Sequence, residues 1–315
     1  PASPTHGIPD DGGLIRCVVE TCCATKGGTS KVAEGHTIHA LAARLNTAFV
    51  GQPVRVSSPQ HTFAAEAGRL NGHEMRQASA HGKNLLVAFA DAPTLHVHLG
   101  MFGSFSVRAH KRAIRDGWLR TEPPASGSER LRLLTLTHLG DLRRPMQCRL
   151  LDDDGVAALL DRLGPDPLAP EHDPDAAVRV LHRSRREIGL LLVDQSVVAG
   201  IGNVYRAELL FRAGLSPWLP GSAVDLNLLR TLWSDATYLM SIGTAAGWII
   251  TDTRQVEQAA PYLDRGERVP RWPKVYAVYG RAGQPCRRCG TPIDSAAQGR
   301  QRIFWCPRCQ PFVDD

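Results

Sequence analysis

Two Cys-x-x-Cys pairs near the C-terminus are the residues whose type and spacing point most directly to chemistry. Cys286 and Cys289 form the first pair, Cys306 and Cys309 form the second, and sixteen residues separate the two pairs. Four thiolates at this spacing can close a tetrahedral zinc site. Because four protein ligands leave no open coordination position, the sequence predicts one structural Zn²⁺ ion.

Arginines crowd the same segment, namely Arg287, Arg288, Arg300, Arg302 and Arg308. Positive charge on a metal-clamped hairpin favours a nucleic-acid partner. The alternative is that the metal only stabilises a module with too few apolar residues to fold without it. Both interpretations can hold for one hairpin.

A glycine-rich bend in VAGIGNVYRAELLF is the second candidate site. Gly200, Gly202 and Asn203 predict a tight bend, and the helix that follows starts with free backbone N–H groups that suit a phosphate. The Asn203 amide and the Arg206 charge can join such a site. An ordinary bend, with glycines needed only for close packing, explains the pattern equally well. Glu34, just before a predicted helix over 37–49, stands where the helix dipole favours a carboxylate.

The composition narrows the class of protein. The chain has 315 residues, of which 43% are hydrophobic, and a formal net charge of +6. This length suits two domains and a small appendage, and the charge favours a polyanionic partner. No stretch approaches the roughly 18–20 apolar residues of a membrane helix, so we expect no membrane association. The cysteines do not form a secreted disulfide framework, which favours a reducing cytoplasm.

The pattern divides the chain into four segments and predicts an α+β fold. Residues 1–31 are rich in Pro, Gly, Ser and Thr, and are expected to be disordered or foreign to the fold. In 32–168, a helix over 37–49 precedes five or more short alternating runs, which predict an antiparallel β-sandwich. Residues 169–275 are helical in character and end in a polar loop over 252–274. Residues 276–315 contain the four cysteines.

Six motifs occur in an order that resembles one protein family. They are AEGHTIH, HGKNLL, HVHLGMFG, LGPDPL, DQSVVAGIGNVYRAELLF and the paired cysteines ending in WCPRCQ. The set is similar to formamidopyrimidine-DNA glycosylase and endonuclease VIII, and it runs from Val32 to Gln310. The EGHT opening looks like the endonuclease VIII branch. The resemblance implies a β-sandwich, a helix–two-turn–helix domain and a zinc hairpin.

The same resemblance implies an activity and a partner. The expected function is a bifunctional DNA glycosylase and AP lyase that excises oxidised pyrimidines in base excision repair and cuts the backbone by β- and δ-elimination. The partner would be double-stranded DNA with a damaged base or an abasic site, bound by a monomer in a bacterial cytoplasm. Two alternatives stay open: a glycosylase for oxidised purines, and a catalytically inactive DNA-binding protein.

Catalytic roles carry over to three positions. In the family, an N-terminal proline amine attacks C1′ of the damaged nucleotide and forms a Schiff base, and the next glutamate serves in acid–base steps. Glu34 matches that glutamate, and Ala33 stands where the family has proline. Lys83 in HGKNLL matches a lysine that contacts a DNA phosphate; alone, it would be read as a solvated surface lysine.

DNA-binding roles carry over less uniformly. Met101 and Phe102 match a wedge that fills the gap left by a flipped base, although core packing would explain an isolated Met-Phe pair. Arg143 resembles an arginine inserted near the orphan base, and Asn203 matches a phosphate-binding asparagine. The family arginine of the hairpin falls at Gln301 here, so Arg300 or Arg302 must replace it, and we favour Arg300.

The residue at the nucleophile position is a departure from the family. In this sequence Val32 precedes Ala33, and an amide nitrogen cannot act as a nucleophile. We expect that the valine codon at position 32 is the true start and is read as methionine. Removal of that methionine would leave a chain that begins at Ala33, whose α-amine has a pKa near 8. Pro1 and an internal lysine are the other candidate amines.

Overall fold

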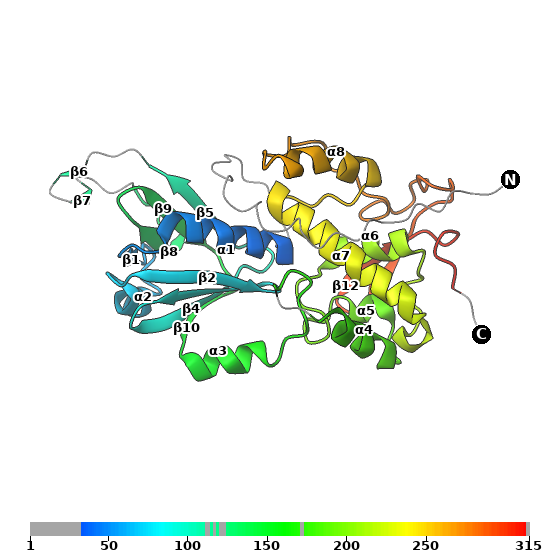
Figure 1. The fold of residues 1–315 in the computed structure, drawn as a ribbon, viewed down its shortest axis with the longest axis horizontal. Helices are drawn as coiled ribbons and strands as arrows, with labels where there is room; N and C mark the ends of the chain where they lie inside the picture. Colours follow the sequence, from blue (N-terminus) through cyan, green and yellow to red (C-terminus); the bar gives the residue numbers. More distant parts are fainter. Residues whose placement is uncertain (1–32, 111–113, 116–117, 120–123, 171–172, 313–315) are drawn as a thin grey trace.

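The computed structural model describes residues 33–110, 114–115, 118–119, 124–170 and 173–312. The expectation for residues 1–31 therefore lies outside the described part of the chain. In Figure 1 the described residues form a β-rich half and a helical half of one elongated molecule. The C-terminal hairpin lies beside the helical half.

Two four-stranded antiparallel sheets form the β-rich half and confirm the predicted sandwich. The first has the order β1-β8-β9-β5 and the second the order β10-β4-β3-β2. Short β6 and β7 make a separate hairpin. The strand bounds are β1 Arg55–Ser57, β2 Met75–His81, β3 Asn84–Phe89, β4 Ala92–His98, β5 Ser104–Ala109, β6 Ile114–Arg115, β7 Trp118–Leu119, β8 Glu129–Leu134, β9 His138–Arg143 and β10 Gln147–Leu151.

Helix α1 (Gly35–Phe49) supplies one wall of the sandwich core. Its apolar residues recur at helical spacing, and Ile38, Leu41, Leu45 and Phe49 are all buried there, as the sequence pattern predicts. Helix α2 (Ala64–Leu70) packs against strand β1, and helix α3 (Asp153–Leu160) follows the last strand. The N-terminal end of α1 reaches helix α7 of the other half, so the residues just before α1 lie at the junction.

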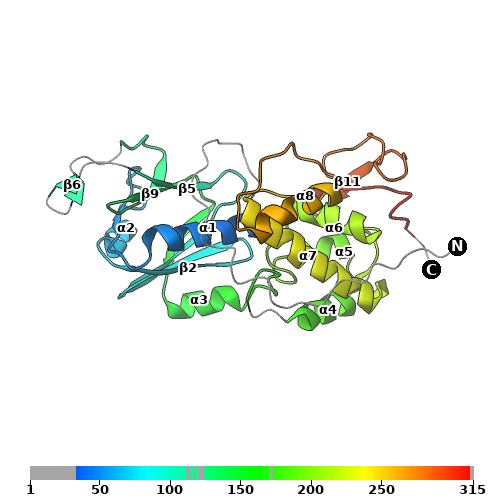
Figure 2. The ribbon, with the colours of Figure 1, turned by 45° about the horizontal axis from the view of Figure 1, so that its top comes forward.

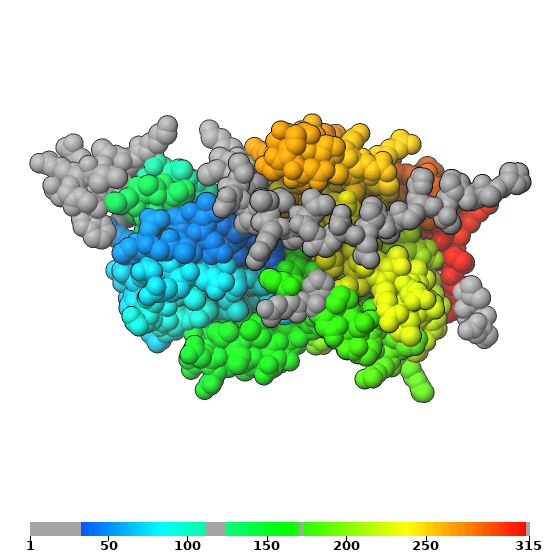
Figure 3. All heavy atoms as spheres, viewed as in Figure 1, coloured from blue at the N-terminus to red at the C-terminus, as the bar shows by residue number. Residues whose placement is uncertain are grey.

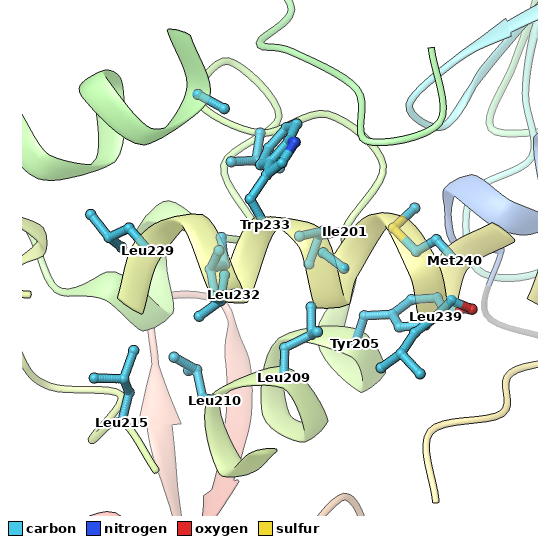
Figure 4. Packing of buried hydrophobic residues seen from close by; sticks show 14 of the residues in the cluster. Ile201, Tyr205, Leu209, Leu210, Leu215, Leu229, Leu232, Trp233, Leu239 and Met240 are labelled. Carbon is cyan, nitrogen blue, oxygen red and sulfur yellow. The ribbon is translucent and has the colours of Figure 1, made fainter. Parts of the chain in front are cut away.

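The helical half is built around α6 and α7. Its elements are α4 Pro174–Arg183, α5 Ile188–Leu191, α6 Asn203–Ala213, the 3₁₀ turn Gly221–Ala223, α7 Leu226–Ala246 and α8 Thr253–Asp264. Aspartates cap three of the helix starts, because a short carboxylate side chain can accept the first free N–H groups. Figure 4 shows Leu209 and Tyr205 of α6 packed against Leu232 and Leu239 of α7.

Half of the loop expected over 252–274 is helix α8, so that expectation was wrong. Asp252 caps the helix, and Val256 and Ala259 are buried on one face. Pro261 lies in the later part of α8. It has no backbone N–H to donate to the preceding turn, but the helix continues past it. Figure 2 shows α8 lying over α7.

The C-terminal hairpin consists of β11 (Asp294–Gln298) and β12 (Gln301–Trp305). Its buried Ile303 and the cysteines share an apolar cluster with Ala207 and Phe211 of α6, so the hairpin is docked on the helical half. In the space-filling view, the helical half also lies directly against the sandwich half (Figure 3). Among the helices described, none combines the length and the apolar character that crossing a membrane requires.

Candidate active site

Glu34 belongs to the sandwich half, and its side-chain carboxylate reaches the N-terminus of helix α6. It is fully buried, and its Oε2 accepts the Gly202 N–H at 2.9 Å while its Oε1 accepts the Val204 N–H at 2.9 Å. The Tyr205 N–H adds a longer bond of 3.4 Å, and the helix dipole reinforces all three. A Cβ at Gly202 would overlap the Glu34 carboxylate, which explains the glycine.

This contact occupies backbone N–H groups that were expected to be free at the start of α6. The N–H groups of Val204 and Tyr205 are already bound by Glu34, so the anion at this helix end belongs to the chain itself. The glycines of the bend are needed for that carboxylate and for the left-handed backbone of Gly200, which has φ of +97°. Close packing also contributes, because a Cβ at Gly200 would lie 3.2 Å from the Met240 methyl group of α7.

Lys83 lies on the turn between β2 and β3, beside Glu34. Its Nζ donates to the Ile201 carbonyl at 2.8 Å, so it is not a freely solvated surface lysine. Burial lowers the pKa of Lys83; Glu34 opposes that shift and Arg206 adds to it. Burial likewise raises the pKa of Glu34, against the opposing effects of Lys83 and the backbone N–H groups. Burial therefore favours the neutral form of each group, and the attraction between the two charges opposes that effect.

Arg206 does not present its charge to solvent as the sequence suggested. It is fully buried; it donates to the Gly189 carbonyl at 3.3 Å and to the side-chain oxygen of Asn203. It also contacts the Arg302 carbonyl of the hairpin at 3.4 Å. Burial lowers the pKa of Arg206 to about 10. Its place is structural, because it joins α6 to the zinc hairpin.

Asn203 and the hairpin tip lie together. The Asn203 amide Nδ2 donates to the Arg302 carbonyl at 2.9 Å. The Arg302 guanidinium donates to Ser295 on the paired strand at 2.9 Å, whereas Arg300 follows Gly299 in the exposed turn. Within the described chain, Arg300 has no ion pair or side-chain hydrogen bond. Arg300 is therefore the tip arginine whose charge is available.

Met101 and Phe102 project from the loop between β4 and β5. Their exposed fractions are 63% and 70%, so core packing does not account for them. Gly100, which has φ of +67°, turns the loop, and its N–H donates to His98 Nδ1 at 3.1 Å. The loop thus holds two large apolar side chains in solvent.

Arg143, at the end of β9, is engaged inside the sandwich. Its Nη2 pairs with Glu129 and, at 3.3 Å, with Asp141, and its Nε donates to Ser128 at 3.2 Å. The side chain keeps 28% of its surface exposed. Hydrogen bonds from Ser126 and Arg143 outweigh burial and lower the pKa of Glu129 to about 2, so Glu129 stays charged at neutral pH.

Ala33 is nearly buried, 8% exposed, in the apolar cluster of the sandwich. It directly precedes Glu34 and so stands at the same junction. The next residue, Gly35, donates its N–H to the Gly200 carbonyl at 2.8 Å. A Cβ at Gly35 would lie 2.8 Å from the Gly200 Cα, so the chain passes the bend too closely for any larger residue.

The four C-terminal cysteines form a site for one structural zinc ion. Their Sγ atoms all lie within 4.8 Å of one another, with Cys286 and Cys309 at 3.9 Å and Cys289 and Cys306 at 3.5 Å. A tetrahedron with Zn–S bonds of about 2.3 Å needs separations of this size. Backbone N–H groups of Arg288 and Cys309 point at two of the sulfurs, as suits thiolates.

Comparisons with known proteins agree over almost the whole chain. The N-terminal domain of formamidopyrimidine-DNA glycosylase matches residues 23–145, its H2TH domain matches 163–255, and the zinc finger found in FPG and IleRS matches 283–311. Endonuclease 8 1 of Mycobacterium tuberculosis is 44% identical over 278 residues, which are 88% of this chain and 99% of the relative. The chain belongs to the formamidopyrimidine-DNA glycosylase and endonuclease VIII family.

Other proteins of the family are also similar to this chain. The formamidopyrimidine-DNA glycosylase of Thermomicrobium roseum is 35% identical over 78% of this chain and 85% of its own length. The crystal structure of the Thermus thermophilus protein has a TM-score of 0.63 at 27% identity, covering 89% of this chain and all of that one. A Lactococcus lactis Fpg mutant bound to Fapy-dG DNA, 22% identical, shares the fold with a TM-score of 0.67 and the same coverage. Members of this family are DNA glycosylases with AP lyase activity.

Asp166, in the family motif LGPDPL, was not among the predicted site residues, although it holds the junction together. Its buried carboxylate accepts from His39 Nε2 at 2.7 Å, from the Gly82 N–H at 2.7 Å and from the Leu168 N–H at 2.8 Å. It therefore ties α1 and the turn that carries Lys83 to the start of the helical half. An acid between two prolines was the only local signal.

Three other residues near the site were missed as well. The charge of Glu34 is felt by Tyr276 and Tyr279, whose pKa values burial raises first and Glu34 raises further. Glu208 holds the segment with both tyrosines, because its carboxylate accepts the N–H groups of Val278 and Tyr279 at 2.9 Å. These contacts join residues some 70 positions apart, and no local pattern marks them.

Proposed function

We propose that this chain is a bifunctional DNA glycosylase and AP lyase that excises oxidised pyrimidines and cleaves the backbone by β- and δ-elimination. The observation that carries the proposal is the Glu34 carboxylate, buried and fixed at the start of α6, directly after Ala33 and beside Lys83. A carboxylate next to an α-amine at Ala33 supplies the groups that imine formation and proton abstraction need. Family membership supports the same reaction.

For the substrate we favour oxidised pyrimidines. The support is the EGHT opening and the 44% identity to a protein named Endonuclease 8 1. Oxidised purines are the second candidate, supported by the 35% identity to a formamidopyrimidine-DNA glycosylase. Excision rates on duplexes with thymine glycol and with 8-oxoguanine decide between them, because the two candidates differ in the lesion pocket and not in the scaffold.

The family resemblance supports the remaining assignments. We propose that Lys83, Asn203 and Arg300 contact DNA phosphates and that Arg143 lies near the orphan base. We also propose a monomer in the bacterial cytoplasm, where zinc thiolates stay reduced, and segments of 32–168, 169–275 and 276–315. The partner would be double-stranded DNA containing a damaged base or an abasic site.

Base extrusion gives Met101 and Phe102 a function. The target bond is inaccessible in the stack, and rotating the nucleotide out costs a few kcal/mol, which an inserted apolar wedge offsets. Replacing both residues with alanine should weaken binding to an abasic duplex about 10-fold or more, since base–aromatic stacking is worth about 1–3 kcal/mol. The melting temperature should not change, because both side chains are exposed.

Binding isotherms and thermal melts of the double variant test this expectation. Val180→Ala is a matched control, since Val180 is an exposed apolar residue on α4, 44% exposed, with no assigned DNA contact. Equal affinities of the double variant and the control would remove the wedge assignment.

The nucleophile assignment is tested with a chain that begins at Ala33. Its α-amine, with a pKa near 8, should form a Schiff base with abasic DNA, and borohydride should fix the adduct on Ala33. Ala33→Pro in the same chain should keep or raise the activity, because a proline imine is permanently charged. Peptide mass mapping identifies the modified residue, and an adduct elsewhere would show that Ala33 is not the amine. The absence of any adduct or nick would favour an inactive DNA-binding protein.

A further inference from the structure

The loop that joins β9 to β10 lies against the loop of residues 99–103, which carries the exposed apolar pair of the proposed wedge. A Cβ at Gly100 would lie 2.8 Å from the Cβ of Met146, and a Cβ at Gly103 would lie 3.0 Å from the Arg144 carbonyl oxygen. The two glycines that flank the apolar pair therefore let the β9–β10 loop approach closely. Met146 is itself 63% exposed, so this second loop also presents an apolar side chain to solvent.

Arg143 is the first arginine at this loop, and buried carboxylates hold it. Glu129 and Asp141 are both completely buried, and the Arg143 guanidinium pairs with each of them. Its Nε also donates to Ser128 at 3.2 Å. Insertion of this side chain into a duplex would leave Glu129 without its closest guanidinium partner, and an unpaired buried charge is strongly destabilising. Arg143 is therefore suited to brace the loop rather than to leave it.

The side chain of Arg144 has none of these restraints. The residue is exposed, and within the part of the chain that the structure describes, its guanidinium makes no hydrogen bond or ion pair. Its backbone has φ of +44°, a left-handed conformation that glycine adopts freely and arginine rarely adopts. Strained residues of this kind are concentrated at binding sites, where the surrounding structure holds them in place. Arg144 thus offers an unpaired cation directly beside the wedge loop.

The chemistry of a guanidinium determines which orphan base it would favour. A guanidinium has only donors, and they are arranged as a planar fork. Guanine presents O6 and N7 as neighbouring acceptors, and arginine binds this pair with two hydrogen bonds. Adenine presents N7 beside an amino donor, with which a guanidinium cannot pair. Because guanine pairs with cytosine and adenine with thymine, a guanine preference favours lesions that derive from cytosine.

We propose that Arg144 contacts the orphan base and gives this chain a preference for lesions opposite guanine, and hence for oxidised cytosines among the oxidised pyrimidines. This inference rests on the proposed function. Arg143 is then a positioning residue, which braces the loop through Glu129 and Asp141. Met146 extends the apolar surface beside the wedge.

The test measures binding of the full chain to two duplexes that contain a tetrahydrofuran analogue of an abasic site, opposite either guanine or adenine. The analogue has no aldehyde, so the lyase cannot cleave it and binding alone is measured. The ratio of the two affinities cancels the phosphate contacts, which are the same in both duplexes. The wild-type chain should bind the guanine duplex about 5-fold or more tightly than the adenine duplex, the discrimination expected of one bidentate contact.

Two substitutions of Arg144 separate recognition from structure. Arg144→Gly should abolish the guanine preference, while the melting temperature should not fall, because glycine suits a φ of +44°. Arg144→Gln should shift the preference toward adenine, because a glutamine amide pairs with N6 and N7 of that base. Arg143→Gln should instead lower the melting temperature and keep the guanine preference, since this side chain holds buried carboxylates.

Three results would overturn the inference: equal affinities of the wild-type chain for the two duplexes, a guanine preference that survives Arg144→Gly, or a preference that a folded Arg143→Gln variant loses. None of these bears on the proposed function, which is measured separately as excision of an oxidised pyrimidine by the wild-type protein. A chain that excises the lesion without a guanine preference would keep the proposed function and lose the role of Arg144.

Discussion

Replacing Glu34 with glutamine should lower the turnover of base excision by about 10²–10⁴-fold, the usual contribution of a positioned acid–base group. Glutamine has nearly the same size, but its amide cannot exchange protons at neutral pH. Single-turnover base release from a duplex with an oxidised pyrimidine measures the effect. A variant that keeps more than about a tenth of the wild-type rate would place the essential carboxylate elsewhere.

The same change also weakens the junction, and a control must separate the two effects. Both oxygens of Glu34 accept backbone N–H groups, and glutamine would turn an NH₂ group toward one of them. Glu208→Gln is matched, because Glu208 is equally buried and also accepts N–H groups, from Val278 and Tyr279. We expect similar losses of thermal stability and a far smaller loss of turnover for Glu208→Gln.

Replacing Cys306 with serine should remove the zinc ion and most of the affinity for abasic DNA. Zinc binding to such modules is worth about 10–16 kcal/mol and is coupled to their folding. The effect should extend beyond the hairpin, since the Arg302 carbonyl on β12 accepts from both Asn203 and Arg206. Zinc content by elemental analysis and binding isotherms give the two measurements, and the sandwich should keep its β-type circular dichroism.

Cys148→Ser is the control for this experiment. Cys148 lies half-buried on β10, and burial raises the pKa of its thiol to about 12, so it is a neutral thiol far from the metal ligands in sequence. This variant should keep both zinc and DNA affinity. Wild-type affinity in metal-free Cys306→Ser protein would separate the hairpin from DNA binding.

The features that could be predicted from the sequence are those with a local pattern. The zinc ligands follow from their spacing, α1 from the recurrence of Ile38, Leu41 and Leu45, and the sandwich from alternating runs between turns. Helix α8 was missed because its polar composition and Pro261 resemble a loop, while only Val256 and Ala259 mark its buried face.

The contacts that assemble the site could not be predicted in this way. Glu34 reaches N–H groups 168 to 171 positions away, and a sequence pattern shows only that the helix end would attract some anion. Arg206 appeared to be a free charge, because its burial depends on the hairpin carbonyl of Arg302, 96 positions later. Side-chain partners of this kind are fixed by tertiary packing.

The bend at Ala199–Gly202 has a consequence for how the two halves could move. The Ala199 N–H donates to the Pro165 carbonyl, the Gly200 carbonyl accepts from Gly35, and the last two residues hold Lys83 and Glu34. A hinge opening between the halves would pull all of these apart together. Glu34 would then meet water and lose the burial that raises its pKa. Opening would therefore bring the pKa of Glu34 back toward its ordinary value, and closure would favour the protonated acid again.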